Sequence, residues 1–189
     1  MNGEFSKTPK IMLIRHAEKP TSSRHGVKPD GTRKKGSLTV LGWQRAGALA
    51  CLLGRPREFA GPSPLAPPQF IFASKPLEHR GSKRSLQTVT PIAKKLGIKV
   101  NSKFPKEAIA ELLKEAAFRD GVVLICWQRE YLPQIANLIL GNNTTAPQNW
   151  DDDRFDLVWV FEKDVTTFRY HFRQAPQELL AGDLTTPIL

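Results

Sequence analysis

The chain has 189 residues, the size of one ordinary domain with room for a sizeable hydrophobic core. It has no apolar stretch of membrane-spanning length and no charged-then-apolar leader, so we expect a soluble, unexported protein of the cytoplasm without a membrane partner. Its 28 Lys and Arg outnumber its 18 Asp and Glu, and the resulting net charge of +10 favours anionic ligands.

The two cysteines, Cys51 and Cys126, stand in apolar surroundings and lack the spacing of metal ligands. We therefore predict two buried free thiols in a reducing compartment, and neither a zinc site nor a disulfide bond. The sequence implies no metal and no organic cofactor.

The predicted elements alternate along the chain between apolar runs and amphipathic segments. Strands are expected at 10–15, 69–74, 121–126 and 156–161, and helices at 40–53, 84–96, 106–117 and 131–140. A final segment, 166–172, alternates like the hairpin partner of the strand before it.

This alternation predicts a three-layer α/β/α sandwich with a mostly parallel sheet and an antiparallel edge hairpin. We expect one domain over 1–189, with a frayed start at 1–9 and a tail that wraps the surface at 173–189. Ligands of such sheets bind beyond the carboxyl ends of the strands. The prediction places Arg15, His16 and Arg129 at those ends, and Arg84 follows another strand.

The first predicted strand ends at Arg15-His16, and a polar loop containing Pro20 follows at once. A histidine at the end of a buried strand is held rigidly with its ring toward a cleft, and a neighbouring arginine attracts an anion. Such a histidine could accept a phosphoryl group. An isolated Arg-His pair, however, more often only begins a loop.

Three further motifs follow the Arg-His strand in order. They are the capped helix start Ser37–Ala46, the short apolar run Ile71–Ser74 and the amphipathic helix start Arg84–Thr88. Over residues 10–162 this order resembles the histidine phosphatase superfamily, the phosphoglycerate-mutase-like proteins. The resemblance lies in the succession of motifs rather than in any one of them.

The resemblance implies a phosphohydrolase that acts on an anionic phosphorylated small molecule or a phosphoprotein. His16 would be the nucleophile that becomes phosphohistidine, and Arg15 and Arg84 would clamp the phosphate. The chemistry fits these roles, because phosphoryl transfer depends mostly on positioning and charge neutralisation, which guanidinium groups supply. Nearby arginines also favour the neutral imidazole that can attack phosphorus.

The chain departs from the family pattern at the second active-site histidine. In the subgroup that it most resembles, this histidine follows a Cys-Trp-x tripeptide, whereas here the segment is Cys126-Trp127-Gln128-Arg129. Arg129 could bind phosphate but could not relay a proton, which predicts slow catalysis with ligand affinity kept. Alternatively, Arg129 points to solvent or pairs with Glu130, or His79 replaces the missing group. The rival function is a turnover-deficient protein of the same fold that binds phosphorylated ligands.

The acid that protonates the leaving group has three candidates. Many relatives use a carboxylate from the insertion between the second and third core strands, where Glu107 and Glu111 stand here at i and i+4 of a predicted helix. We favour a solvent-facing position for both. Glu18, two residues beyond His16, is the third candidate and could instead pair with Lys19.

Nine Lys or Arg residues lie between Lys7 and Lys35. Because no nucleic-acid motif or basic-aromatic interleaving accompanies them, we expect no nucleic acid partner. We interpret the cluster as a basic rim that steers anionic substrates toward His16, although a solvated loop would have the same composition. The rim consists of Lys19, Arg24, Lys28, Arg33, Lys34 and Lys35.

Overall fold

The computed structural model describes residues 9–55, 63–76 and 82–189. The strands are β1 (Lys10–Arg15), β2 (Phe70–Ala73), β3 (Val122–Trp127), β4 (Leu157–Lys163) and β5 (Tyr170–Pro176), and the helices are α1 (Val40–Leu53), α2 (Arg84–Leu96), α3 (Ile109–Ala117) and α4 (Leu132–Leu140). A short 3₁₀ helix, η2 (Arg129–Tyr131), precedes α4. Within the described ranges, no helix has the length and apolarity needed to cross a bilayer.

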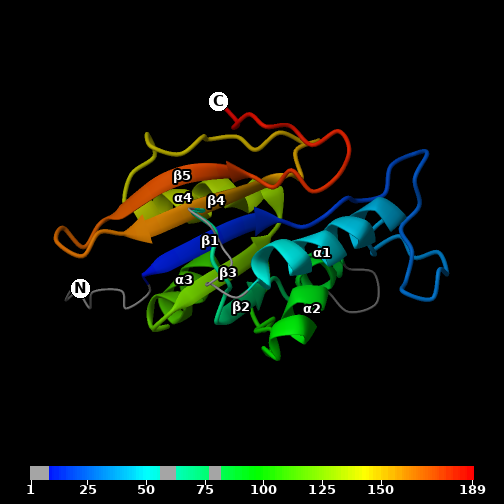
Figure 1. The fold of residues 1–189 in the computed structure, drawn as a ribbon, viewed down its shortest axis with the longest axis horizontal. Helices are drawn as coiled ribbons and strands as arrows, with labels where there is room; N and C mark the ends of the chain where they lie inside the picture. The colour runs from blue at the N-terminus through cyan, green and yellow to red at the C-terminus, as the bar shows by residue number, and fades with distance from the viewer. Residues whose placement is uncertain (1–8, 56–62, 77–81) are drawn as a thin grey trace.

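The strands form one five-stranded sheet in the order β2-β3-β1-β4-β5 (Figure 1). Strands β2, β3 and β1 pair in parallel, β4 pairs antiparallel with β1, and β5 pairs antiparallel with β4. All the strands except β4 therefore run in the same direction. The mostly parallel sheet with an antiparallel edge hairpin is confirmed.

Helices cover both faces of the sheet, as Figure 1 shows. Successive residues of a strand point to opposite faces, and in β1 Met12 and Ile14 pack with α1 and α2, whereas Ile11 and Leu13 pack with α3 and α4. Each face of the central strands is thus buried under a helical layer. This arrangement confirms the three-layer α/β/α sandwich.

Helix α1 is fixed against the loop that follows β1. The side chain of Thr39 caps the helix by accepting the Gly42 N–H at 3.1 Å, and the Thr39 N–H donates to the Glu18 carbonyl oxygen at 3.1 Å. A Cβ on Gly42 would lie 2.8 Å from that same carbonyl oxygen, so glycine is needed for this close approach. The contact sets the position of the loop that begins at His16.

Two predicted boundaries are wrong because local turns displace them. The helix expected at 106–117 begins at Ile109, since the Ala108 N–H donates to the Pro105 carbonyl oxygen and closes a turn. The strand expected at 166–172 is Tyr170–Pro176, since the Asp164 carboxylate accepts the N–H groups of residues 166 and 167 and extends the connecting turn.

The predicted tail at 173–189 is also corrected. Its first residues belong to β5, and Ile188 is buried in the core on the α3 and α4 side of the sheet. The Ile188 N–H donates to the Gln174 side chain at 3.0 Å, and Arg154 donates to the Thr186 carbonyl oxygen at 2.7 Å. The end of the chain is therefore an integral part of the packing. At the other end, residues 1–8 of the segment predicted to fray lie outside the described residues.

The two cysteines differ in their surroundings. Cys126 in β3 is buried, and burial raises the pKa of its thiol. Cys51 is free but exposed, which contradicts the predicted burial. It lies on the outer face of α1, whose neighbouring residues Ala50 and Leu53 face the core. Apolar sequence neighbours of a helical residue can belong to the opposite face of the helix.

Candidate active site

His16 follows β1 directly and is held against the end of the neighbouring strand β3. Its backbone N–H donates to the carbonyl oxygen of Trp127, the last residue of β3, at 3.1 Å. Its side chain is buried, and Nδ1 lies 2.8 Å from the carbonyl oxygen of Ala17. Because a carbonyl oxygen can only accept, Nδ1 carries the hydrogen and Nε2 keeps a free lone pair.

The surroundings of His16 keep its ring neutral. Burial lowers its pKa from 6.5 to about 3, against the opposing effect of the hydrogen bond to Ala17. The positive charges of Arg84, Arg15 and Lys19 lower the pKa further. At neutral pH the ring therefore has an unprotonated Nε2, which is the state required for attack on phosphorus.

Arg84, the first residue of α2, is coupled to the loop that carries His16. The Thr88 hydroxyl donates to the Arg84 carbonyl oxygen at 2.8 Å and accepts the Ala17 N–H at 2.8 Å. Burial lowers the pKa of Arg84, and Glu130 opposes that effect. Its buried Nε finds no hydrogen-bond partner in the described part of the chain. A half-buried cation at a helix N-terminus, with an unused donor, is suited to binding an anion.

Arg15 is almost fully buried and joins β1 to the segment Asp151–Arg154, which we call the acidic segment. Its Nη1 lies 3.1, 2.8 and 3.2 Å from the carbonyl oxygens of Asp151, Asp152 and Arg154. Its guanidinium group lies 3.9 Å from the centroid of the Phe155 ring. Burial lowers the pKa of Arg15 to about 10 despite the opposing charge of Asp152. Most of its donors therefore bind this segment.

Arg129 also turns toward the acidic segment. Its Nε lies 2.9 Å from Oδ1 of Asp152, and its Nη1 donates to the Trp150 carbonyl oxygen at 3.2 Å. Glu130 instead lies 3.8 Å from Lys106. The structure thus pairs Arg129 with a residue that the sequence analysis did not consider. His79, the other proposed replacement for the second histidine, lies outside the described residues.

Asp152 is the functional candidate that sequence reasoning missed. Its Oδ1 lies 2.7 Å from Nζ of Lys19, 2.9 Å from Nε of Arg129 and 3.3 Å from Nη2 of Arg15. The hydrogen bond from Lys19 and the charges of Lys19, Arg129 and Arg15 outweigh burial and lower the pKa of Asp152. The only signal in the sequence is a run of three aspartates before β4 in a strongly basic chain.

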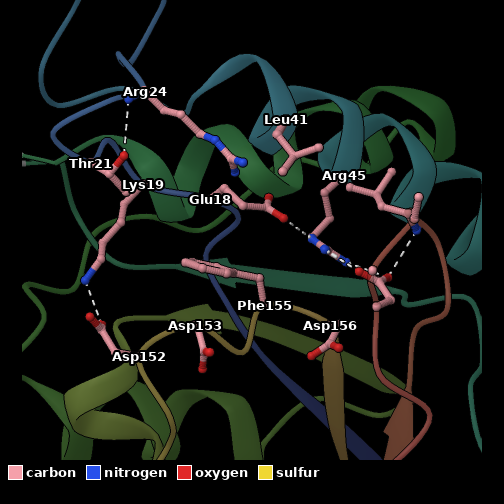
Figure 2. Close-up of a pocket in the computed structure, with 14 residues that line it drawn as sticks. Glu18, Lys19, Thr21, Arg24, Leu41, Arg45, Asp152, Asp153, Phe155 and Asp156 are labelled. Carbon is pink, nitrogen blue, oxygen red and sulfur yellow. Dashed lines mark hydrogen bonds and ion pairs between the residues drawn. The ribbon is translucent and has the colours of Figure 1, made fainter.

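A cavity of about 450 Å³ opens beside Lys19 and Asp152 (Figure 2). Phe155, which lines the cavity, places its ring centroid 6.4 Å from that of His16. The wall of the cavity does not itself include His16, Arg15, Arg84 or Arg129. The other lining residues come from the loop after β1, from α1, from the segment before β4 and from the chain end: Glu18, Thr21, Arg24, Leu41, Arg45, Asp153, Asp156, Leu180, Ala181, Gly182 and Asp183.

Glu18 lies in the cavity wall but does not pair with Lys19. Its Oε1 accepts a hydrogen bond from Nε of Arg45 at 2.8 Å (Figure 2). Its buried Oε2 has no hydrogen-bond partner among the described residues. Arg45 also binds both carboxylate oxygens of Asp183, at 2.7 and 3.0 Å. Burial acts to lower the pKa of Arg45, but its partners Asp183 and Glu18 outweigh it and raise that pKa.

The other two predicted acids lie at the surface. Glu107 stands in the turn before α3, with a side chain that is 62% exposed and 3.9 Å from Lys106. Glu111 is exposed in the first turn of α3. Of the three predicted acids, therefore, Glu18 is the one in the cavity beside His16.

The basic rim is largely solvent-exposed. Lys19 binds Asp152, and Lys28 lies 3.8 Å from Asp30. Arg33, Lys34 and Lys35 are exposed and make no ion pair with the described residues. Together with His25 they line a second hollow of about 450 Å³.

Comparison with known proteins gives structural matches alone: no family model and no curated protein sequence matches this chain. YhfR from Bacillus stearothermophilus aligns with a TM-score of 0.57 and 14% identity, over 94% of this chain and 98% of that chain. A mutant phosphoserine phosphatase from Entamoeba histolytica, in complex with phosphoserine, aligns with a TM-score of 0.55 and 14% identity, over 92% of this chain and 99% of that chain. A mycobacterial glucosyl-3-phosphoglycerate phosphatase, in complex with inorganic phosphate, aligns with a TM-score of 0.51 and 14% identity, over 88% of this chain and 95% of that chain.

These matches span nearly the whole length of each solved chain. They show that this protein shares its α/β fold with these solved proteins, in agreement with the α/β class that the alternation of strands and helices predicts. At this level of identity the likeness describes the fold, whereas activity has to be argued from the residues of the site.

Proposed function

We propose that this chain is a phosphohydrolase that acts on a phosphomonoester or a phosphoprotein through a phosphohistidine at His16. The observation that carries the proposal is the placement of His16 at the end of β1, where it is buried and Nδ1 donates to the Ala17 carbonyl oxygen, which leaves Nε2 as the unprotonated nitrogen. Arg84 beside it has a buried, unused donor. The fold is shared with phosphatases that are solved with phosphoserine or inorganic phosphate, which supports the same reaction class.

In the first step Nε2 of His16 attacks phosphorus, the bond from phosphorus to the ester oxygen breaks, and the leaving oxygen takes up a proton. Arg84 neutralises the charge that spreads over the equatorial oxygens. Glu18 is the predicted acid that lines the adjoining cavity. In the second step water attacks the phosphohistidine, the bond from Nε2 to phosphorus breaks, and one proton of the water passes to the group that protonated the leaving oxygen. Inorganic phosphate is released and the neutral imidazole is restored.

The test is hydrolysis of a generic aryl phosphate by the wild type and by a His16→Ala variant. We expect the variant to lose about a hundredfold or more of the rate, because nucleophile and intermediate are both removed. A His25→Ala variant, which removes an exposed imidazole, serves as the control and should keep the wild-type rate. If slow hydrolysis continues unchanged in the His16→Ala variant, the hydrolase proposal is wrong.

A second candidate function is a protein that binds phosphorylated ligands with little turnover. The observation in its favour is Arg129, which occupies the second-histidine position and is tied to Asp152 and to the Trp150 carbonyl oxygen. Arginine offers charge but cannot relay a proton. Restoring histidine in an Arg129→His variant should raise the hydrolysis rate if this replacement limits turnover. An unchanged rate would show that Arg129 is not the limiting feature.

A further inference from the structure

The carboxylate of Asp152 gathers three cations that come from separate parts of the chain. Arg15 ends β1, Lys19 lies in the loop that follows, and Arg129 begins η2. All three direct a nitrogen to the same oxygen, Oδ1, at distances of 2.7 to 3.3 Å. We call these three residues the cationic trio.

This arrangement has the chemistry of an oxyanion site that is already occupied. Guanidinium and ammonium groups that converge on one oxygen match the donors that proteins use for phosphate. Without an anion between them, the three like charges would repel one another. Two members of the trio lie near His16: Arg15 precedes it directly, and the charges of Arg15 and Lys19 add to burial in lowering the pKa of His16.

We propose that Asp152 is an internal ligand of an oxyanion site formed by Arg15, Lys19 and Arg129, and that it competes there with the phosphate group of an incoming ligand. This inference rests on the proposed function, because it assumes that the trio faces the phosphorylated ligand. The site is for a phosphate-type oxyanion, and Asp152 determines both its affinity and its selectivity.

Selectivity follows from competition inside the same molecule. A tethered carboxylate has an effective concentration in the millimolar range or above, so a free carboxylate of equal charge must exceed that concentration to displace it. A phosphate dianion carries more charge and more acceptor oxygens, and therefore displaces Asp152 more readily. Asp152 thus excludes carboxylates while it admits phosphates.

Release of Asp152 requires rotation of one side chain only. That side chain is 58% exposed, so it can turn toward solvent. The backbone of the acidic segment stays anchored, because Nη1 of Arg15 binds its carbonyl oxygens and the Trp150 indole donates to the Arg154 carbonyl oxygen at 2.8 Å. The oxyanion site can therefore open without unfolding the segment.

The experiment compares Asp152→Asn with Asp153→Asn. Both variants remove one negative charge from adjacent residues that line the same cavity, but Asp153 makes no ion pair with the described residues. Binding of inorganic phosphate and of acetate is measured by titration calorimetry, and urea unfolding verifies that each variant is folded. We expect Asp152→Asn to bind phosphate about tenfold more tightly and to bind acetate measurably, whereas Asp153→Asn changes phosphate binding by about threefold at most.

A further variant, Lys19→Gln in the Asp152→Asn background, should abolish most of the gain in phosphate affinity, because it removes one donor of the site. If Asp152→Asn binds phosphate no more tightly than Asp153→Asn, Asp152 only positions the trio and the inference is overturned. The assay uses no turnover, so its outcome is separate from that of the His16→Ala experiment. Tighter phosphate binding together with unchanged hydrolysis by His16→Ala would leave the oxyanion site standing and reject the hydrolase.

Discussion

Because His16 is buried and neutral, the folding stability of the protein should depend on pH in a way that can be calculated. Its pKa is about 3 in the folded protein, against 6.5 for an ordinary histidine. Below the higher value the unfolded chain takes up a proton that the folded protein does not, so folding stability falls as the pH is lowered through this window. Replacing His16 with Asn removes this proton uptake.

The size of the effect follows from proton linkage. One such proton weakens folding by up to about 1.4 kcal/mol per pH unit, which amounts to about 2 kcal/mol between about pH 7 and pH 5. His16→Asn should therefore become more stable relative to the wild type by about 2 kcal/mol over this interval. The absolute effect of the substitution at neutral pH also includes lost packing and is a separate quantity.

The assay is urea unfolding at the two pH values, followed by tryptophan fluorescence, since Trp127, Trp150 and Trp159 are all buried. A His25→Asn variant controls for the loss of an exposed imidazole and should follow the wild-type pH dependence. Parallel pH dependence of the wild type and His16→Asn would refute the reasoning, because it would mean that folded His16 is protonated at about pH 5 like an exposed histidine.

Three further predictions concern the site and its surroundings. An Arg84→Gln variant should weaken phosphate binding in calorimetry by about tenfold or more with little change in melting temperature, because its buried Nε has no partner among the described residues; equal affinity would remove Arg84 from the site. Replacing both Lys34 and Lys35 with Gln should lower kcat/KM for phosphate-ester hydrolysis and flatten its dependence on salt concentration. The same change at the exposed Lys94–Lys95 pair of α2 serves as the control and should have neither effect. Identical salt dependence of kcat/KM in the two double variants would argue against electrostatic steering. An Arg45→Met variant should lose about 3 to 5 kcal/mol in urea unfolding, since it leaves two buried carboxylates unpaired, and a loss below about 1 kcal/mol would contradict that account.

The sequence predicts the core elements well where local signals are strong. The bounds of α1 and α2 match the prediction, because Thr39 caps one helix and Gly97 ends the other in the left-handed region. The boundaries at Ile109 and Tyr170 were missed because the adjacent turns, which are closed by local hydrogen bonds, use residues that also suit a helix or a strand. Periodicity describes faces of an element rather than its ends.

The same contrast holds for the site. The prediction of His16 and Arg84 as site residues rests on the order of the motifs and on the meeting of the carboxyl ends of parallel strands at one edge of the sheet, and it stays a prediction. The pairing of Arg129 with Asp152 was missed, since side-chain direction depends on contacts between segments that the sequence does not place. The alternative pairing of Glu18 with Lys19 was wrong for the same reason: Arg45 and Asp183, far away in the sequence, complete the buried network.

The cavity beside His16 draws its walls from both ends of the described chain, from Glu18 near the start to Asp183 near the end. During synthesis the loop after β1 leaves the ribosome long before residues 180–183. Arg45 can therefore pair with Asp183 only after the strands of the sheet have been synthesised. The cavity is therefore completed only after residues 180–183 have been synthesised, and ribosome-bound intermediates that lack these residues should contain His16 without the complete cavity.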